Sequence, residues 1–416
     1  MRNWRFTAVV IILVVLLDFY IFQAVRTVCQ GASPRWRAII FNGYWALTII
    51  SLLLFALLPM LTDPYWHRVR TYAFATILGF FFAKLLAAVF FLVDDIRRLI
   101  QWASAKLFFP NTDTEGENIS EEGISRSVFL SWLGIGMGGA LFSSLVYGFS
   151  NKYSYKIRRI SLAFDNLPPA FKGLKIIQLS DIHSGSLANL QAVSHGVDLV
   201  LAEKADLILF TGDLVNDTAV EMEPYKDIFS RLKAPMGVFS TLGNHDYGDY
   251  IWWETPELKK ANLDRLKKLQ TDMGWRLLMN EHVALEKDGQ HIALIGIENW
   301  SAKARFPKHG RLNEAYAGAE KYPFKILMSH DPSHWDAQVR PHFPDIDLAL
   351  AGHTHGMQFG VEIPGLKWSP VQYVYKQWAG LYEAGRQKLY VNRGFGFIGY
   401  PGRVGILPEI TVIELT

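Results

Sequence analysis

The 416-residue sequence predicts an α/β domain that follows a bundle of four membrane-spanning helices. Four mostly apolar stretches lie in the first part of the chain, at about residues 6–25, 38–60, 71–93 and 128–149. A helix of about 20 apolar residues is long enough to cross a bilayer. Five shorter apolar runs follow, and runs of their length bounded by polar or glycine residues are typical of buried strands. We therefore expect residues 1–150 to form an all-α membrane domain and residues 151–416 an α/β domain.

The composition supports this division. Half of the residues are hydrophobic and only 19% are charged, and the apolar excess lies in the first part of the chain. The net charge of +3 gives no reason to expect nucleic-acid binding. The single cysteine, Cys29, excludes an intrachain disulfide and lies far from the histidines in sequence, so we expect no catalytic cysteine.

The membrane stretches contain two buried charges. The first stretch is too long for a signal peptide and is followed by no small-residue cleavage site, so it is predicted to remain as a span. Asp18 lies 12 residues into the first span and Lys84 lies 13 residues into the third. These two spans run in the same direction, and at about 1.5 Å per residue the two charges reach similar depths. Because charges within a bilayer are costly and usually paired, we predict an Asp18–Lys84 ion pair.

Two segments connect the third and fourth spans. Residues 95–109 carry apolar side chains at helical spacing together with basic ones, which predicts a helix on the membrane surface or in the aqueous phase. Residues 111–126 are acidic and contain glycine, which predicts a flexible loop. Basic residues near the span ends divide eight to seven between the two sides, and the dense cluster 152–159 favours a cytoplasmic α/β domain.

Residues that bind divalent cations follow all five strand-like runs. The runs 174–179, 207–211, 238–242, 324–328 and 348–351 precede, respectively, Asp181 with His183, Asp213, Asn244 with His245 and Asp246, His330, and His353 with His355. Open α/β sheets place their sites at the carboxyl ends of strands, so we expect one sheet edge to collect these side chains. Imidazole and carboxylate ligands suit Zn, Fe or Mn, and one carboxylate can bridge two ions about 3.5–4 Å apart.

The ordered blocks DxH, GD, GNHD, H and GHTH resemble the signature of the calcineurin-like metallophosphoesterases. The resemblance covers about residues 172–416, and the run RVGILPE at 403–409 is similar to the membrane-associated bacterial branch. It implies a four-layer α/β/β/α sandwich, in which two mixed sheets face each other with helices outside. Within it, residues 153–164 are expected to form an edge strand, and 389–392 and 410–415 late strands.

The resemblance also implies a role for each site residue. Asp181, His183 and His355 would hold one divalent cation, Asn244, His330 and His353 a second, and Asp213 would bridge them. Asn244 and His245 would act on the substrate, His245 as a general acid or phosphate ligand. The implied reaction is hydrolysis of a phosphate monoester, diester or pyrophosphate by a hydroxide that the two cations, Mn, Fe or Zn, generate at neutral pH.

The sequence departs from the family pattern at one position. The second Asp of the usual GDxxD block, which orients the histidine of the GNH block, is Asn216 here. An Asn carbonyl can still accept the imidazole N–H, but it cannot stabilise an imidazolium by charge. Asn216 and Asp246 are expected either to support the ligands or to contact substrate, and His334, one turn after His330, either contacts substrate or packs in the core. The aromatic residues at 247, 250, 252 and 253 either pack locally or form an apolar wall near the site.

Four spans are more than an anchor needs, and they favour a substrate that resides in the membrane. We expect a lipid-linked phosphate, such as a phospholipid or a nucleotide-activated lipid precursor, and a multi-pass protein of the bacterial inner membrane. The alternative is a membrane sensor, in which the α/β domain binds a phosphorylated ligand without turnover. Hydrolysis by the purified protein distinguishes the two.

Overall fold

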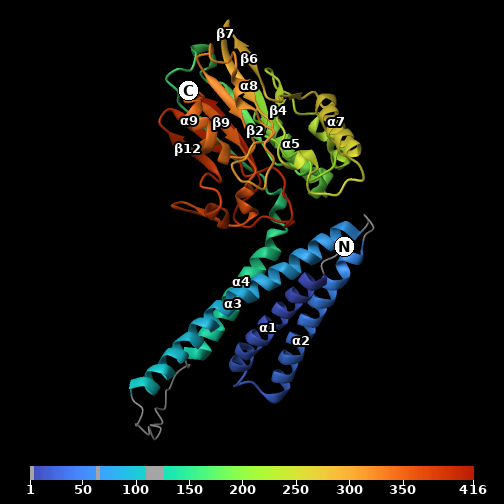
Figure 1. Ribbon diagram of the computed structural model, residues 1–416, viewed down its shortest axis with the longest axis vertical. Helices are drawn as coiled ribbons and strands as arrows, with labels where there is room; N and C mark the ends of the chain where they lie inside the picture. The colour runs from blue at the N-terminus through green and yellow to red at the C-terminus, as the bar shows by residue number, and fades with distance from the viewer. Residues whose placement is uncertain (1–3, 62–65, 109–125) are drawn as a thin grey trace. The chain divides into compact units, whose positions relative to one another are not determined.

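The computed structural model describes residues 4–61, 66–108 and 126–416 of the chain. The chain divides into two compact units, Met1–Tyr147 and Gly148–Thr416 (Figure 1).

Four long helices make up the described part of the first unit: α1 (Trp4–Val28), α2 (Pro34–Leu57), α3 (His67–Phe108) and α4 (Arg126–Gly148), with a short 3₁₀ turn η1 (Leu58–Met60) after α2. Pro34 occupies the first turn of α2, where its missing N–H costs no hydrogen bond. All four helices are long and apolar enough to cross a membrane, and many large apolar side chains are exposed on them. Such surfaces fit a lipid environment, so the chain is a membrane protein.

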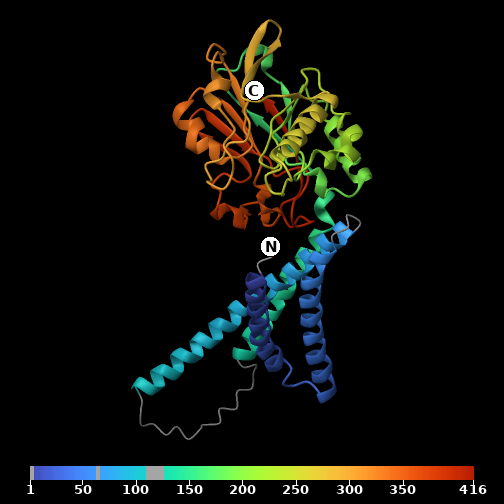
Figure 2. The same ribbon diagram turned by 45° about the vertical axis from the view of Figure 1, so that its right-hand side comes forward.

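Helix α3 is longer than the predicted third span. It continues without a break through residues 95–108, so the expected connecting segment is the second part of the same helix rather than a separate one (Figure 2). At about 1.5 Å per residue, a 42-residue helix is about 63 Å long, roughly twice the hydrocarbon thickness of a bilayer. Of the expected acidic loop 111–126, all but Arg126 lies outside the described residues.

The predicted ion pair between α1 and α3 is confirmed. Lys84 Nζ donates to Asp18 Oδ1, and the two residues are only 7% and 0% exposed. Helix α2 completes the network, since the hydroxyls of Tyr44 and Thr48 donate to the same carboxylate oxygen at 2.9 and 3.0 Å. The pair thus joins three helices through one desolvated carboxylate.

The second unit contains two six-stranded sheets and a separate hairpin (Figure 1). The first sheet has the order β1 (Lys156–Leu162), β14 (Glu409–Leu415), β2 (Lys175–Leu179), β3 (Leu207–Phe210), β4 (Val238–Ser240), β5 (Arg276–Leu277). The second has the order β12 (Gly380–Ala384), β13 (Gln387–Val391), β9 (Leu348–Ala351), β8 (Lys325–Met328), β7 (Gln290–Gly296), β6 (Glu281–Lys287). Strands β10 (Val361–Ile363) and β11 (Leu366–Trp368) form the hairpin.

Alternation along the strands creates the four layers. On β2, Ile176 belongs to the core between the two sheets, whereas Ile177 belongs to a second core beneath α5 (Leu190–Ala202) and α7 (Pro256–Asp272). A third core lies between the other sheet and α8 (Leu312–Tyr316), with residues that lead into α9 (Arg340–His342). Successive side chains of a strand point to opposite faces. Because both faces of these strands are buried, the residues on both faces are apolar. The α/β/β/α sandwich is confirmed.

One expectation about the sheets is wrong. The five site strands do not share a sheet edge, because β2, β3 and β4 belong to the first sheet and β8 and β9 to the second. The strands are parallel within each group, so each group directs its carboxyl ends to one side. The edge strand expected at 153–164 is β1, and the late strands expected at 389–392 and 410–415 are β13 and β14.

The buried pair in the membrane unit generates a prediction about stability. Asp18→Asn or Lys84→Met alone should each cost about 3–5 kcal/mol, because each leaves one buried charge unpaired, whereas the double variant should lose much less than the sum. The measurement is a double-mutant cycle on thermal unfolding of the detergent-solubilised protein. Arg98→Met serves as a control because the Arg98 side chain is 60% exposed and should matter little. Additive losses at 18 and 84 would contradict the coupling.

Candidate metal centre

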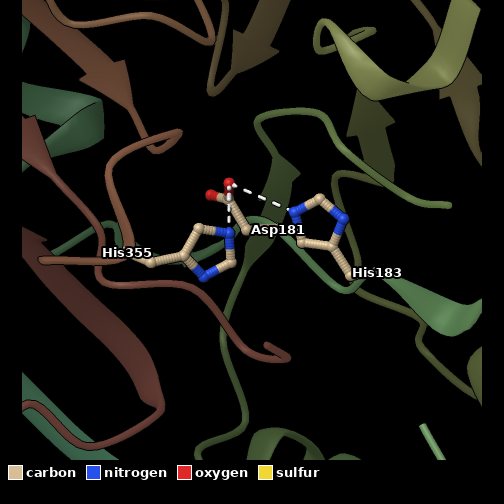
Figure 3. Close-up of side chains that lie close together, drawn as sticks. All are labelled: Asp181, His183 and His355. Carbon is tan, nitrogen blue, oxygen red and sulfur yellow. Dashed lines mark ion pairs between the residues drawn. The ribbon is translucent and has the colours of Figure 1, made fainter. Parts of the chain in front are cut away.

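The first cluster of ligand atoms consists of Asp181, His183 and His355, whose ligand atoms all lie within 4.8 Å of one another (Figure 3). Asp181 Oδ1 is 3.2 Å from His355 Nε2 and 3.9 Å from His183 Nε2. All three side chains are buried. The first two follow β2, and His355 follows β9, so the cluster joins the two sheets.

The second cluster consists of Asp213, His330 and His353, again within 4.8 Å. Asp213 Oδ2 is 3.1 Å from His330 Nε2, and that nitrogen is 3.2 Å from His353 Nδ1. The same oxygen of Asp213 is 3.5 Å from His183 Nε2, a member of the first cluster. Asp213 therefore lies between the two clusters, the position that a bridging carboxylate requires.

The donor atoms in these clusters fit cations. His355 Nε2 and Asn244 Oδ1 are buried and accept no hydrogen bond from any described residue. Asn244 Nδ2 donates to the hydroxyl of Tyr250 at 2.8 Å, which identifies Oδ1 as the atom left free for a cation. Buried polar atoms without partners are costly, and a bound metal would satisfy both.

The backbone around the site is strained. Asp181, His183, Asp213, His353 and His355 all have positive φ, between 48° and 69°. Non-glycine residues rarely adopt this conformation, and it persists mainly at functional sites. Two glycines permit the close packing: a Cβ at Gly352 would lie 2.2 Å from Asp181 Oδ2, and one at Gly243 would lie 2.2 Å from Asp213 Oδ1. The glycines of the GHTH and GNHD blocks therefore make room for the carboxylates.

The electrostatics of the site favour positive charge. Burial opposes the ionisation of Asp213, yet the imidazoles of His330 and His245 hold the pKa of its carboxyl well below the usual range. Burial likewise opposes the protonation of His330, but Asp213 and Asp181 raise its pKa to about 10. A proton is thus held where the carboxylates converge. Divalent cations would supply the same compensation with more charge.

Asp246 binds main-chain groups of two loops that carry site residues. Its Oδ2 accepts the main-chain N–H groups of Gly243 and Asp213 at 2.8 and 2.9 Å, and its Oδ1 accepts those of Leu214 and Val215 at 2.8 and 3.3 Å. Burial and repulsion from Asp213 raise the pKa of Asp246 to about 7, although its main-chain donors oppose that rise. The carboxylate therefore fastens the loop after β3 to the loop after β4.

His245 is held by a group other than the Asn216 side chain. Its Nδ1 lies 2.7 Å from the main-chain carbonyl of Asn216, while the Asn216 side chain bonds to Ser186 Oγ. The His245 ring packs on Tyr250, with 4.4 Å between centroids, and meets the edge of His183 at 4.9 Å. The main chain thus orients the imidazole, so the change from Asp to Asn at position 216 leaves its partner in place.

His334 is buried among protein groups. It is 1% exposed, and its ring nitrogens contact Ser329 Oγ at 2.9 Å and Gln338 Oε1 at 2.7 Å. Burial lowers its pKa to about 4, so it is neutral at physiological pH. The aromatic residues after His245 differ in exposure. Tyr247 is buried and its hydroxyl donates to Glu298, whereas Trp252 is 83% exposed.

Sequence reasoning missed two residues that position the ligands. The hydroxyl of Tyr375 lies 2.9 Å from His353 Nε2 and 3.2 Å from Asp331 Oδ2, so it links a ligand to a buried carboxylate. Arg403 is fully buried and donates to the carbonyls of His355 and Arg393 at 3.1 and 2.8 Å. Arg403 begins the RVGILPE run, which signalled family resemblance without revealing this contact. No local pattern marks Tyr375.

Glu409 ends the same run and is equally buried. It accepts from the Arg393 guanidinium and, at 2.6 Å, from the hydroxyl of Tyr390. Both ends of the run therefore contact Arg393 in the loop at 392–396. This loop packs on the loop of Asp181 through the hydrogen bond from Gly396 N to Asp181 O at 2.9 Å.

Comparison with known proteins agrees with this geometry. A family profile described as "Probable Calcineurin-like phosphoesterase, transmembrane domain" matches residues 1–152, and one described as "Calcineurin-like phosphoesterase" matches residues 174–357. The second range contains all the residues of both clusters.

Relatives with similar sequences occur in animals and bacteria. The "Transmembrane protein with metallophosphoesterase domain" of Danio rerio is 29% identical over 65% of this chain and 60% of its own length. The "Uncharacterized metallophosphoesterase YkuE" of Bacillus subtilis is 29% identical over 70% of this chain and 98% of its own. The "Phosphodiesterase YaeI" of Escherichia coli is 29% identical over 63% and 88%. This chain thus spans less than two thirds of the Danio rerio protein. It belongs to the calcineurin-like metallophosphoesterases that carry a four-helix transmembrane domain.

Proposed function

We propose that the protein hydrolyses a phosphate ester or pyrophosphate of a lipid-linked substrate, with two divalent cations bound in the second unit. Asp181, His183 and His355 would hold one cation, Asn244, His330 and His353 the other, and Asp213 both. The observation that carries the proposal is the position of Asp213 Oδ2, which lies 3.5 Å from His183 in one cluster and 3.1 Å from His330 in the other.

The chemistry divides between the cations and the side chains. Two divalent cations held by these residues would supply Lewis-acid activation of water and would offset the negative charge of the phosphate oxygens. Asn244 lies with its Nδ2 directed at Tyr250 and adds a fixed amide dipole beside the reacting group. His245 donates its Nδ1 proton to the Asn216 carbonyl, which leaves Nε2 to carry the proton for the leaving oxygen.

The basic residues near the site and the four membrane helices favour a lipid-linked phosphate as the substrate. The loop at 301–308 borders the second cluster, since the ring of Phe306 meets that of His353 at 4.8 Å and Lys303 Nζ lies 5.3 Å from the Tyr375 ring centroid. Arg305 and Lys308 on this loop are exposed, so the loop offers cations to an anionic headgroup. The four helices keep the enzyme where lipid phosphates are concentrated. We further propose that the second unit is cytoplasmic, because basic residues cluster at 152–159.

A sensor without turnover is the second candidate, and one contact favours it. The main-chain N–H of Arg403 donates at 2.9 Å to the carbonyl of Gly148, the last residue of α4, while the Arg403 side chain contacts His355. The end of the last membrane helix is therefore one residue away from a metal ligand. A ligand bound at the metals could act on the helices through this contact.

A substrate panel tests the proposal. The purified protein, loaded with Mn²⁺, is offered an aryl phosphate, an aryl phosphodiester, lipid phosphates and sugar-nucleotide lipids. Turnover of a lipid substrate with higher kcat/KM than the aryl compounds supports it. Tight binding of a phosphorylated lipid with no turnover of any compound would support the sensor instead.

The shared carboxylate should be indispensable. Asp213→Asn should abolish hydrolysis and lower the bound metal toward one ion or none, because a neutral amide cannot neutralise and span two cations. Metal analysis and turnover are measured together. Asp264→Asn on α7 is the control, because that side chain is 51% exposed and should leave both quantities unchanged. Two bound ions with near-normal turnover in Asp213→Asn would refute the bridging role.

His245 should assist the leaving group. His245→Ala should keep both metals but slow turnover by about 10²–10⁴-fold, the usual contribution of general acid–base catalysis. The loss should be larger for substrates with poor leaving groups, which need the proton most. His195→Ala, at an exposed position on α5, is the control. A loss that is equal for good and poor leaving groups would show that His245 only binds phosphate.

The residue at position 216 should not tune His245. Asn216→Asp and Asn216→Ala should both preserve the leaving-group dependence of turnover, because both keep the main-chain carbonyl that accepts from His245 Nδ1. The Asp variant should be the less stable one, since Glu221 Oε2 already accepts the N–H of residue 216 at 2.6 Å and a second carboxylate would repel it. Faster turnover in the Asp variant alone would show that a carboxylate at 216 reaches His245.

A further inference from the structure

The hairpin β10–β11 exposes its apolar residues, whereas a hairpin that faces water exposes its polar residues. Its register pairs Val361 with Trp368, Glu362 with Lys367, and Ile363 with Leu366, so alternate residues share a face. One face carries the four apolar residues Val361, Ile363, Leu366 and Trp368, which we call the hairpin face. The other face carries the two charged residues.

The charged face is turned toward the second unit. Glu362 accepts from the guanidinium groups of Arg158 and Arg393, both at 2.6 Å, and its side chain is only 16% exposed. Lys367 Nζ donates to the carbonyl of Ala379 and lies 4.7 Å from the ring centroid of Trp378. These contacts fix the hairpin to the domain by its charges, and they leave its apolar side chains outward.

Three of the four residues of the hairpin face are exposed, Trp368 is half-buried, and the face has apolar neighbours. Ile363 is 58% exposed, Leu366 51% and Val361 39%, and nearby Tyr373 and Val374 are 77% and 53% exposed. Trp368 Nε1 donates to the Tyr373 hydroxyl at 3.3 Å, so two amphipathic rings border the patch. Contiguous exposed apolar patches mark interaction sites, and Trp and Tyr are enriched where proteins meet the bilayer interface.

Main-chain hydrogen bonds connect the hairpin to Gly148, the first residue of the second unit. Gly148, the final residue of α4 and of its candidate span, accepts a hydrogen bond from Arg403 N. The next residue, Val404, accepts one from Gly360 N at 2.9 Å, directly before β10. Two hydrogen bonds and two residue steps thus connect the end of a membrane helix to the hairpin, a path on the order of 15 Å. Because Gly148 also ends a candidate membrane span, the bilayer is the apolar phase to which the chain connects this hairpin.

We propose that the hairpin face, with Tyr373 and Val374, inserts into the interfacial layer of the membrane that the four helices span. In sequence, the hairpin lies between the loop of His353 and His355 and Tyr375, whose hydroxyl contacts His353. Insertion of the hairpin would hold Tyr375 and the loop of His353 close to the headgroup layer, where a lipid-linked phosphate lies. That last consequence rests on the proposed function, whereas the insertion itself does not.

Depth-dependent quenching tests the insertion without reference to activity. In a Cys29→Ala background, full-length protein in nanodiscs carries an environment-sensitive fluorophore at Ile363→Cys or at Glu286→Cys on β6, where the native side chain is 67% exposed. Lipids with brominated chains should quench the label at 363 strongly and the label at 286 hardly at all. Equal quenching at both positions would overturn the proposal. So would shielding of the 363 label only in discs that hold two copies, which would assign the face to a contact between copies.

Hydrolysis separates this inference from the proposed function. The double variant Ile363→Asp/Leu366→Asp should hydrolyse a lipid phosphate in vesicles at least about tenfold more slowly, since burial of one aliphatic side chain is worth that factor, and should hydrolyse a soluble aryl phosphodiester normally. Val220→Asp/Leu258→Asp, at positions 54% and 49% exposed, is the matched control and should change neither rate. Quenching at 363 without turnover of any lipid would retain the membrane contact and refute the lipid substrate. Equal losses on lipid and soluble substrates would overturn the role of the hairpin face in substrate access.

Discussion

The second unit depends on one carboxylate, that of Asp213, placed between two clusters of buried nitrogen ligands. A carboxylate at 1% exposure is tolerable only where positive charge compensates it. Its neighbours His183 and His330 come from loops of different sheets. The Asp213 carboxylate therefore connects the candidate site residues of the two sheets. The sandwich supplies the geometry, because two packed sheets direct the ends of their parallel strands into the same region.

That geometry is maintained by groups outside the ligand set. Asp246 gathers four main-chain N–H groups from two loops, Arg403 fastens the His355 loop, and Tyr375 holds His353. Such supports are needed because the candidate ligands have left-handed backbone conformations that an unrestrained loop would leave. The site therefore stores strain in its ligands and offsets it by hydrogen bonds one layer farther out.

Each unit contains an acidic side chain in an apolar environment, and in each unit several donors bind that side chain. In the helices, Asp18 receives Lys84 together with two hydroxyls from α2. In the hairpin, Glu362 receives two guanidinium groups, which leaves Ile363 and Leu366 facing outward. In each case donors surround an acidic side chain, and the exposed residues around it are apolar.

The sequence by itself determined the four helices, the strands and the side chains that meet at the metal centre, because apolar periodicity and the order of the ligand blocks are local properties. It also identified Asp18 and Lys84, since helix rise converts sequence position into depth. Only the tertiary structure decided that the ligands come from two sheets, that the Asn216 main chain rather than its side chain orients His245, and that Arg403 and Tyr375 brace the site. These contacts join residues far apart in the chain, and their geometry depends on how the sheets pack, which no local pattern encodes.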